Sequence, residues 1–188
     1  GQPGGLYCPN GGTGINTTIR SPSLLSKRVE LAVVPEDPGA LRYTTTLALR
    51  ETLSRIQIEA PTGYLNGEFN KFHLWNPNNN VSMPVTLGVP WAETDLVPIV
   101  STSDGAHAMA AYSLALPNLL PEFPSRYGYG YFNHYLPNFN TAKWTLVFRR
   151  GPMSRGVYNW NAYICIGSLD EVKSCLFKVR EKREMLLK

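Results

Sequence analysis

A hydroxyl, a carboxylate and an imidazole lie within seven residues of one another in the segment Ser101 to His107, which reads Ser-Thr-Ser-Asp-Gly-Ala-His. These are the groups of a catalytic triad, in which a base activates a nucleophile and an acid orients the base. Triad members usually converge from separate loops, whereas Asp and Ser so close together are typical of a turn that caps the next segment. We therefore predict no catalytic residue. If the chain were instead a small enzyme, Asp104 and His107 would be its only candidate catalytic residues.

The other histidines and the glycines offer little further chemistry. His73, His107 and His134 include no pair at the i, i+2 or i, i+4 spacing of metal ligands. The glycine-rich run Gly11-Gly12-Thr13-Gly14 has no strand before it and no Lys-Ser/Thr after it, which a phosphate-binding loop requires. The sequence thus predicts neither a metal nor a cofactor.

The cysteines are odd in number. Cys8, Cys165 and Cys175 form no C-x-x-C pair, so they indicate neither a disulfide framework nor a zinc site. We therefore expect a reducing compartment.

Composition limits the classes of protein to which the chain can belong. Its 188 residues are enough for one domain with a core of its own. Only 17% of them are charged, against about 25% in an average protein, and the net charge of +4 is too sparse to indicate a nucleic-acid-binding patch by itself. No uninterrupted apolar run of 18 residues occurs, so we expect no membrane-spanning segment.

The 16 Gly and 15 Pro residues disfavour long helices over most of the chain and favour short strands joined by turns. Apolar residues alternate with others at Val29, Leu31 and Val33, and again over 41–50, 81–87, 144–148 and 158–166. This pattern predicts an all-β chain: a two-sheet antiparallel β-sandwich over residues 26–168, preceded by a flexible arm over 1–25.

Two segments depart from the β pattern. Residues 106–116 are rich in Ala, with Asp104 available as a cap, and predict a short helix that ends before Pro117. In the C-terminal segment, 169–188, the capping box Ser168-Leu169-Asp170-Glu171 predicts a helix over 169–187. Cys175 to Val179 could equally be a last strand. Lys182 and Arg183 in the basic tail are the candidates for RNA contact.

Aromatic residues carry a different signal. They crowd around residues 127–135, and Trp91 stands beside a proline. Most such residues fill a core, but Tyr and Trp are also enriched where proteins meet one another or stack on sugars. A sparsely charged surface is easier to desolvate, so we expect neighbouring molecules to cover it. The candidates for a subunit interface are Trp91, Tyr127, Tyr129, Tyr131 and Phe132.

Several segments resemble the capsid proteins of picorna-like positive-strand RNA viruses. Leu41-Arg42-Tyr43 opens a Thr-rich strand and precedes a loop with Asn76-Pro77, as in the middle of such subunits. The run Met83 to Trp91 is similar to the strand of these coats that ends in a Val-Pro-aromatic step. Gly1 resembles the first residue of a product cut from a polyprotein by a viral cysteine protease, so we expect the chain to have been excised from a longer one.

The resemblance implies a jelly roll that tiles an icosahedral shell around the genome, located in the virion after assembly in the host cytoplasm. The implied partners are other capsid subunits, with viral RNA and a host receptor as further candidates, and no catalytic residue is implied. A carbohydrate-binding β-sandwich, such as a lectin-like or receptor-binding spike domain, remains the alternative. Sugar stacking on Trp91 or Tyr129 would distinguish it.

Overall fold

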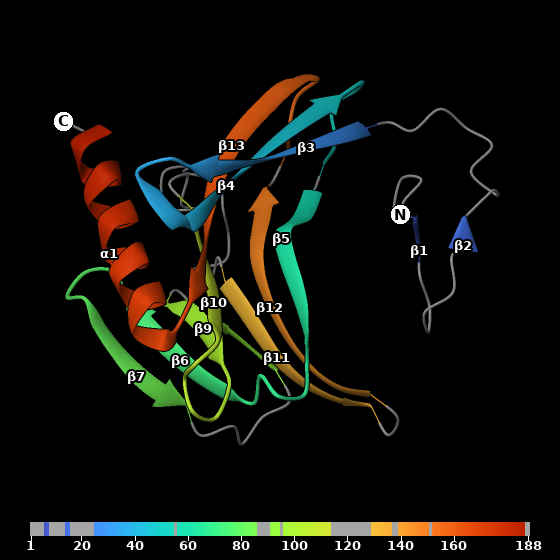
Figure 1. Ribbon diagram of the computed structural model, residues 1–188. Helices are drawn as coiled ribbons and strands as arrows, with labels where there is room; N and C mark the ends of the chain where they lie inside the picture. The colour runs from blue at the N-terminus through green and yellow to red at the C-terminus, as the bar shows by residue number, and fades with distance from the viewer. Residues whose placement is uncertain are drawn as a thin grey trace.

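A computed structural model shows, among the residues it describes, two large antiparallel β-sheets and one helix in three layers, with a separate two-stranded pair near the N-terminus (Figure 1). It describes residues 6–7, 14–15, 25–54, 56–85, 91–94, 96–113, 129–136, 139–150 and 152–186. The predicted two-sheet antiparallel sandwich is confirmed. Of the arm expected over 1–25, the structure describes Leu25 and the short pair β1 (Leu6–Tyr7) and β2 (Gly14–Ile15).

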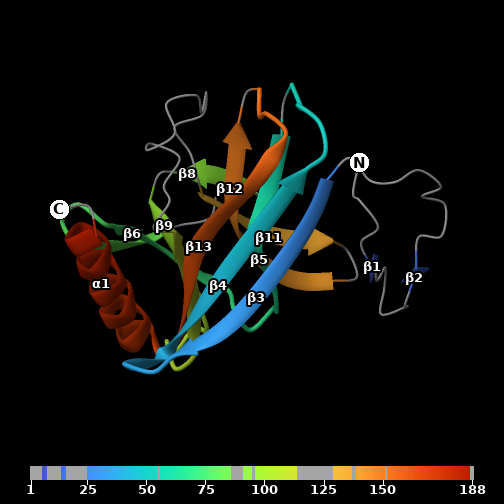
Figure 2. The same ribbon diagram turned by 90° about the horizontal axis from the view of Figure 1, so that it is seen from above.

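The larger sheet has seven strands, with β3 and β7 at its two edges. Its order is β3-β4-β13-β10-β9-β6-β7. These strands are β3 (Leu25–Val34), β4 (Asp37–Leu49), β13 (Gly156–Gly167), β10 (Ala108–Ser113), β9 (Val97–Ser101), β6 (Lys71–Asn76) and β7 (Val81–Val85). Strands β3, β4 and β13 lie side by side in Figure 2.

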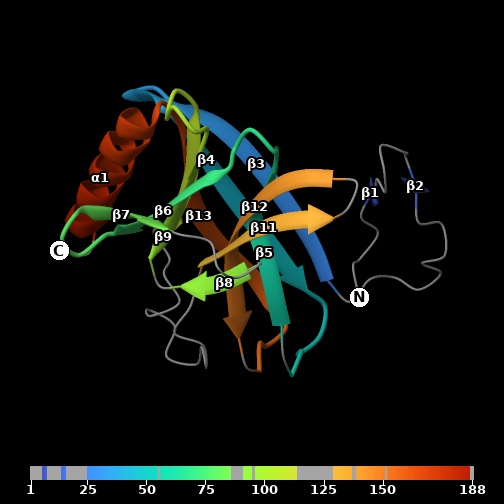
Figure 3. The ribbon, with the colours of Figure 1, turned by 90° about the horizontal axis from the view of Figure 1, so that it is seen from below.

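The smaller sheet has four strands and covers one face of the larger sheet (Figure 3). Its order is β5-β12-β11-β8. The strands are β5 (Ile56–Asn66), β12 (Phe139–Arg150), β11 (Tyr129–Leu136) and β8 (Trp91–Thr94). Buried Phe72 and Val100 of the larger sheet belong to the same apolar cluster as Ala142 and Trp144 of β12, so this cluster joins the two sheets.

Strand pairs are nested in the sequence. Strand β4 pairs with β13, β5 with β12, β8 with β11, and β9 with β10. The chain therefore runs out along one arm of an antiparallel ribbon and returns along the other, with β6 and β7 inserted as a hairpin. The ribbon passes from the larger sheet to the smaller one and back.

The helix predicted over 106–116 is wrong where the structure describes it. Ala108–Ser113 is strand β10, which lies between β9 and β13 in the middle of the larger sheet. Five of its six residues are buried, on both faces of the sheet, so the strand shows no alternation of apolar and polar side chains. Pairing on two sides outweighs the helix propensity of alanine, which is a weak preference. Residues 114–116 lie outside the described residues.

The C-terminal helix is confirmed as α1 (Leu169–Leu186), and the alternative of a strand over Cys175 to Val179 is wrong. The backbone N–H of Ser168 donates to Glu171 Oε2 at 2.7 Å, and the N–H of Glu171 donates to Ser168 Oγ at 3.3 Å. This is the predicted capping box, and it starts the helix directly after β13.

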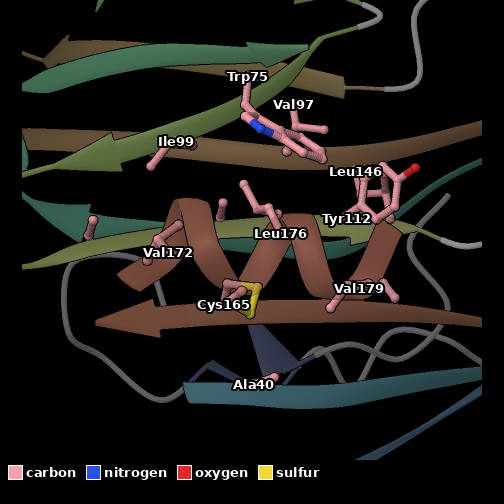
Figure 4. Packing of buried hydrophobic residues seen from close by; sticks show 14 of the residues in the cluster. Ala40, Trp75, Val97, Ile99, Tyr112, Leu146, Cys165, Val172, Leu176 and Val179 are labelled. Atoms are coloured by element: carbon pink, nitrogen blue, oxygen red, sulfur yellow. A yellow bond between two sulfur atoms is a disulfide. The ribbon is translucent and has the colours of Figure 1, made fainter. Parts of the chain in front are cut away.

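Helix α1 covers the other face of the larger sheet with one apolar stripe (Figure 4). Val172, Leu176 and Val179 are buried against the sheet. There, Trp75 and Tyr112 meet edge to face, with ring centroids 5.7 Å apart. The larger sheet is thus buried on both faces at its centre, which explains its continuous apolar strands.

The expectation that the cysteines form no disulfide is wrong, because Cys165 of β13 is bonded to Cys175 of α1. Their Cα atoms lie 5.9 Å apart although ten residues separate them in sequence. The tight step from β13 into α1 lays the helix back over its own strand, which brings the two thiols together. The expectation of a reducing compartment rested on unpaired cysteines and loses that support.

Two features are absent from the ranges that the structure describes. No helix there is both long and apolar enough to cross a bilayer. No group of three His, Cys, Asp or Glu side chains there is placed to hold a metal ion.

Candidate functional site

The segment from Ser101 to His107, which contains the candidate catalytic residues Asp104 and His107, forms a tight turn between β9 and β10. Asp104 Oδ1 accepts hydrogen bonds from Thr102 Oγ1 at 2.6 Å and from the Ala106 N–H at 3.0 Å. The Thr102 N–H donates to the His107 carbonyl at 2.9 Å. Gly105 has a φ of 70°, in the left-handed region that glycine adopts without steric cost. The carboxylate and the Thr102 hydroxyl therefore hold the turn together.

The electrostatics and burial of this turn do not resemble those of a nucleophile and its base. The hydrogen bonds from Thr102 and from the Ala106 N–H lower the pKa of Asp104, whereas a general base works best with a pKa near the working pH. Ser101 Oγ is buried and makes no hydrogen bond among the described residues. No triad geometry is formed by these groups.

A polar groove lies beside the turn and has a volume of about 600 Å³. Asn70, His73 and Asp104 line it, together with the first residue of α1, Leu169. A second hollow of about 410 Å³ shares Asn70 and Asp104 and reaches His107. Burial, and then the positive charge of Lys173, lower the pKa of His73, so its imidazole is neutral near pH 7. The groove thus offers neutral donors and acceptors, one carboxylate and the ammonium group of Lys71, beside apolar side chains such as Phe72.

The strand register separates the predicted aromatic candidates. Tyr129 and Tyr131 pair with Leu146 and Trp144, which are both buried. Phe132 pairs with Trp91 on one side and with Lys143 on the other. The two tyrosine positions therefore alternate with Phe132 along β11, and the four candidates that the structure describes do not share one face of the smaller sheet. Tyr127 lies outside the described residues.

Among the described residues, five of the eight exposed large apolar side chains lie at the edges of the larger sheet, and sequence reasoning did not identify them as a surface. The other three are Tyr64 of β5 and Val157 and Ile166 of β13. Val29, Leu31 and Val33, here called the β3 row, are 40%, 60% and 63% exposed. They pair with Thr45, Tyr43 and Leu41 of β4, so they occupy the face that the smaller sheet covers elsewhere.

The opposite edge of the larger sheet repeats this arrangement. Val81 and Met83 of β7, here called the β7 row, are 46% and 51% exposed. Met83 pairs with Leu74 of β6, which packs against the apolar cluster between the sheets. The smaller sheet has four strands and the larger has seven, so the larger sheet extends beyond its cover on both sides.

A polar contact joins β3 to the smaller sheet at the start of the β3 row. Lys27 Nζ donates to the Glu59 carbonyl of β5 at 3.2 Å. Burial lowers the pKa of Lys27, and the charge of Glu59 partly opposes this shift. Exposure along the row then rises from Val29 to Val33, so the two sheets separate beyond this contact.

The sequence held one signal of this exposed edge. Lys27, Arg28 and Glu30 interrupt an otherwise apolar strand, and charged residues in a strand are typical of a sheet edge. Alternation alone assigns Val29, Leu31 and Val33 to one face, but it cannot tell whether another layer covers that face.

The cations of α1 contact other parts of the same chain. Lys182 Nζ, one of the two predicted RNA contacts, lies 3.8 Å from Glu36 Oε2. Lys178 Nζ lies 3.6 Å from Asp37 Oδ2, and Arg180 donates to the Pro77 carbonyl at 2.9 Å. Arg183 is within α1, but its side chain is outside the described part of the structure.

Comparison with known proteins gives no family. No protein-family model matches the sequence, and no curated protein matches it. Two solved structures share a coarse likeness at 84% coverage of this chain. One is described as "Putative kojibiose phosphorylase from human microbiome", with 6% identity and a TM-score of 0.37. The match spans 19% of that protein's chain. The other is described as a "putative aldose 1-epimerase" from Klebsiella pneumoniae subsp. pneumoniae MGH 78578, with 8% identity and a TM-score of 0.43. The match spans 50% of that protein's chain.

Proposed function

We propose that this chain is a structural subunit that associates with like or related subunits. Following the resemblance described above, these subunits form an icosahedral shell, which is the capsid of a picorna-like RNA virus. The shell is assembled in the host cytoplasm and encloses the genome. The proposal assigns the chain no catalytic role. Its partners are other subunits first, and viral RNA and a host receptor second.

The observation that carries the proposal is the pair of uncovered apolar rows on the larger sheet. A monomeric protein seldom leaves neighbouring large apolar side chains exposed, and such patches usually mark surfaces where proteins meet. The β3 row and the β7 row lie at opposite edges of one sheet, so a subunit has at least two surfaces to offer to neighbours. Two separate contact surfaces on each subunit are what an extended or closed assembly requires.

The nested pairing supports the finer assignment of the sandwich as a jelly roll. A jelly roll is a double-sheet fold in which an antiparallel ribbon winds around the sandwich. The pairs β4–β13, β5–β12, β8–β11 and β9–β10 form such a ribbon, and it visits both sheets.

Contact with RNA is the less supported part of the proposal. To bind a phosphate, Lys182 would have to break its ion pair with Glu36, and this reduces the free energy gained from binding RNA. If Lys182 contacts phosphate, removing it should reduce the salt dependence of RNA affinity by roughly one unit of slope. A salt dependence identical in wild type and Lys182→Ala would remove RNA contact by Lys182 from the proposal.

Solution size tests the main proposal. Light scattering after size-exclusion chromatography, with electron microscopy of the same fractions, should show oligomers or closed particles that form with increasing concentration. A monomer at every concentration, pH and salt tested would overturn it. Binding of that monomer to a glycan array would instead favour the carbohydrate-binding sandwich.

A further inference from the structure

We propose that β3 pairs antiparallel with β3 of a second copy of this chain, along the edge that no described strand occupies, in a two-fold register centred on Val29. The inference rests on the proposed self-association and names the strand that carries it. In this register, Arg28 of each copy lies opposite Glu30 of the other.

The four edges of the sandwich differ in how well they could accept another strand. Strand β7 contains Pro84 and β5 contains Pro61, and proline cannot donate a ladder hydrogen bond. Strand β8 is only four residues long. Strand β3 has ten residues and no proline, so it offers the longest uninterrupted row of backbone donors and acceptors.

Charge complementarity selects the register. The side chains of Arg28 and Glu30 are 76% and 56% exposed and form an ion pair with each other. A register centred on Val29 brings each of them opposite its counterion in the second copy, which makes a network of four alternating charges. A register centred on Glu30 would place two like charges directly opposite each other, and this is unfavourable.

The same register covers the β3 row. Val29 faces Val29 of the second copy, Leu31 faces Lys27, and Val33 faces Leu25. Lys27 is exposed, and its aliphatic stem can cover apolar surface while its ammonium group remains near the Glu59 carbonyl. Each exposed member of the row thus gains an apolar neighbour.

Charge reversal at two positions gives a specific test. Arg28→Glu leaves both positions negative and Glu30→Arg leaves both positive, so each variant should associate about tenfold or more weakly than wild type. An equimolar mixture of the two should associate again, because every cross-strand pair is then of opposite charge. The double variant Arg28→Glu/Glu30→Arg should also associate like wild type. Thermal unfolding of each variant checks that it is folded.

The mixture separates pairing between copies from an effect within one chain, because mixing cannot repair a contact inside a single molecule. Arg50→Glu, at an exposed residue beyond the end of β4, is the matched control and should associate like wild type. Sedimentation velocity is the measurement. If wild type and both reversed variants associate equally, the β3 pairing is wrong while the proposed function stands. If wild type never associates, both fail.

Cross-linking tests the register independently. In a Cys8→Ser background, Val29→Cys should form a disulfide-linked dimer on mild oxidation, because residues opposite each other across the axis have Cα atoms about 4.5–5.5 Å apart. Val157→Cys, at a 65% exposed position of β13, is the control and should form no disulfide-linked dimer under the same conditions. A dimer formed by Leu31→Cys but not by Val29→Cys would overturn the register. A variant truncated before Leu25 that associates more tightly than the full chain would show that residues 1–24 cover the strand and would overturn the pairing.

Discussion

Lys143 Nζ lies 2.9 Å from Glu59 Oε2, so β12 and β5 are joined by an ion pair in addition to their backbone ladder. Only 11% of the Lys143 side chain is exposed, against 35% for Glu59. Lys143 also lies over the ring of Tyr64, 5.1 Å from its centroid. Burial alone would lower the pKa of Lys143, but the hydrogen bond and charge of Glu59 outweigh it and raise the value.

Replacing Lys143 should destabilise the sandwich. We expect Lys143→Met to reduce the free energy of unfolding by about 1–3 kcal/mol, because Glu59 remains half-buried without its counterion. Chemical denaturation measures the change. Lys182→Met is the control, since Lys182 belongs to an exposed pair, 3.8 Å from Glu36, and should change stability by less than about 0.5 kcal/mol. Equal effects in both variants would contradict the special role of the Lys143 pair.

Stability should depend on pH through Glu59. Burial would raise the pKa of Glu59, but the hydrogen bond and charge of Lys143, with hydrogen bonds from Thr62 and Thr145, lower it overall. A folded-state pKa below the unfolded one gives stability that is fully present above the unfolded value of about 4.3 and is lost as pH falls through the folded value. The difference in unfolding free energy between wild type and Glu59→Gln should therefore be largest at neutral pH and shrink in acid. A constant difference down to pH 2 would oppose this assignment.

The disulfide should stabilise the attachment of α1. Cys165 and Cys175 close a loop of ten residues, for which the loss of unfolded-state entropy predicts about 2–3 kcal/mol. Cys175→Ser should lose this amount in denaturation without reductant, and wild type should lose it when reductant is added. Mass spectrometry after alkylation should find one reactive thiol in the unfolded, unreduced protein. Three reactive thiols would show that the bond is absent.

Gly63 should not tolerate a side chain. A Cβ atom there would stand 2.7 Å from Cε2 and Nε1 of the buried Trp144 indole. We expect Gly63→Ala to cost about 1–3 kcal/mol, because the indole has to move within a packed core. Gly156→Ala is the control, since the closest atom to its new Cβ would be 3.5 Å away on Tyr158. Tryptophan fluorescence should shift only in the Gly63 variant.

The sequence predicted those helices and strands that short-range patterns mark, such as a capping box or alternating apolar residues. The capping box at Ser168 and Glu171 and the alternation around Leu31 gave a helix and a strand where the structure has them. Ala110 and Ala111 were misread as helical, because a strand buried on both faces shows no alternation. Whether such a segment is a helix or a central strand depends on its neighbours in space.

Features that depend on distant contacts were beyond the sequence. The Cys165–Cys175 bond requires α1 to fold back on β13, and exposure of Leu31 requires the smaller sheet to leave this part of β3 uncovered. The cross-strand pairing of Phe132 with Trp91 follows from strand order, which composition does not reveal. Asp104 was interpreted correctly as part of a turn, because its partners Thr102 and Ala106 are adjacent in sequence.

The nested strand pairing determines at what point of synthesis the larger sheet can form. Thr44 of β4 bonds to Asn161 of β13, 117 residues later, so the middle of the larger sheet closes only after nearly all described strands have been synthesised. Contacts so distant along the chain slow folding, because a long loop must be ordered before they form. Until β13 arrives, the hairpin of β3 and β4 has two open edges instead of one. A chain interrupted before Gly156 would keep both open and would aggregate rather than assemble.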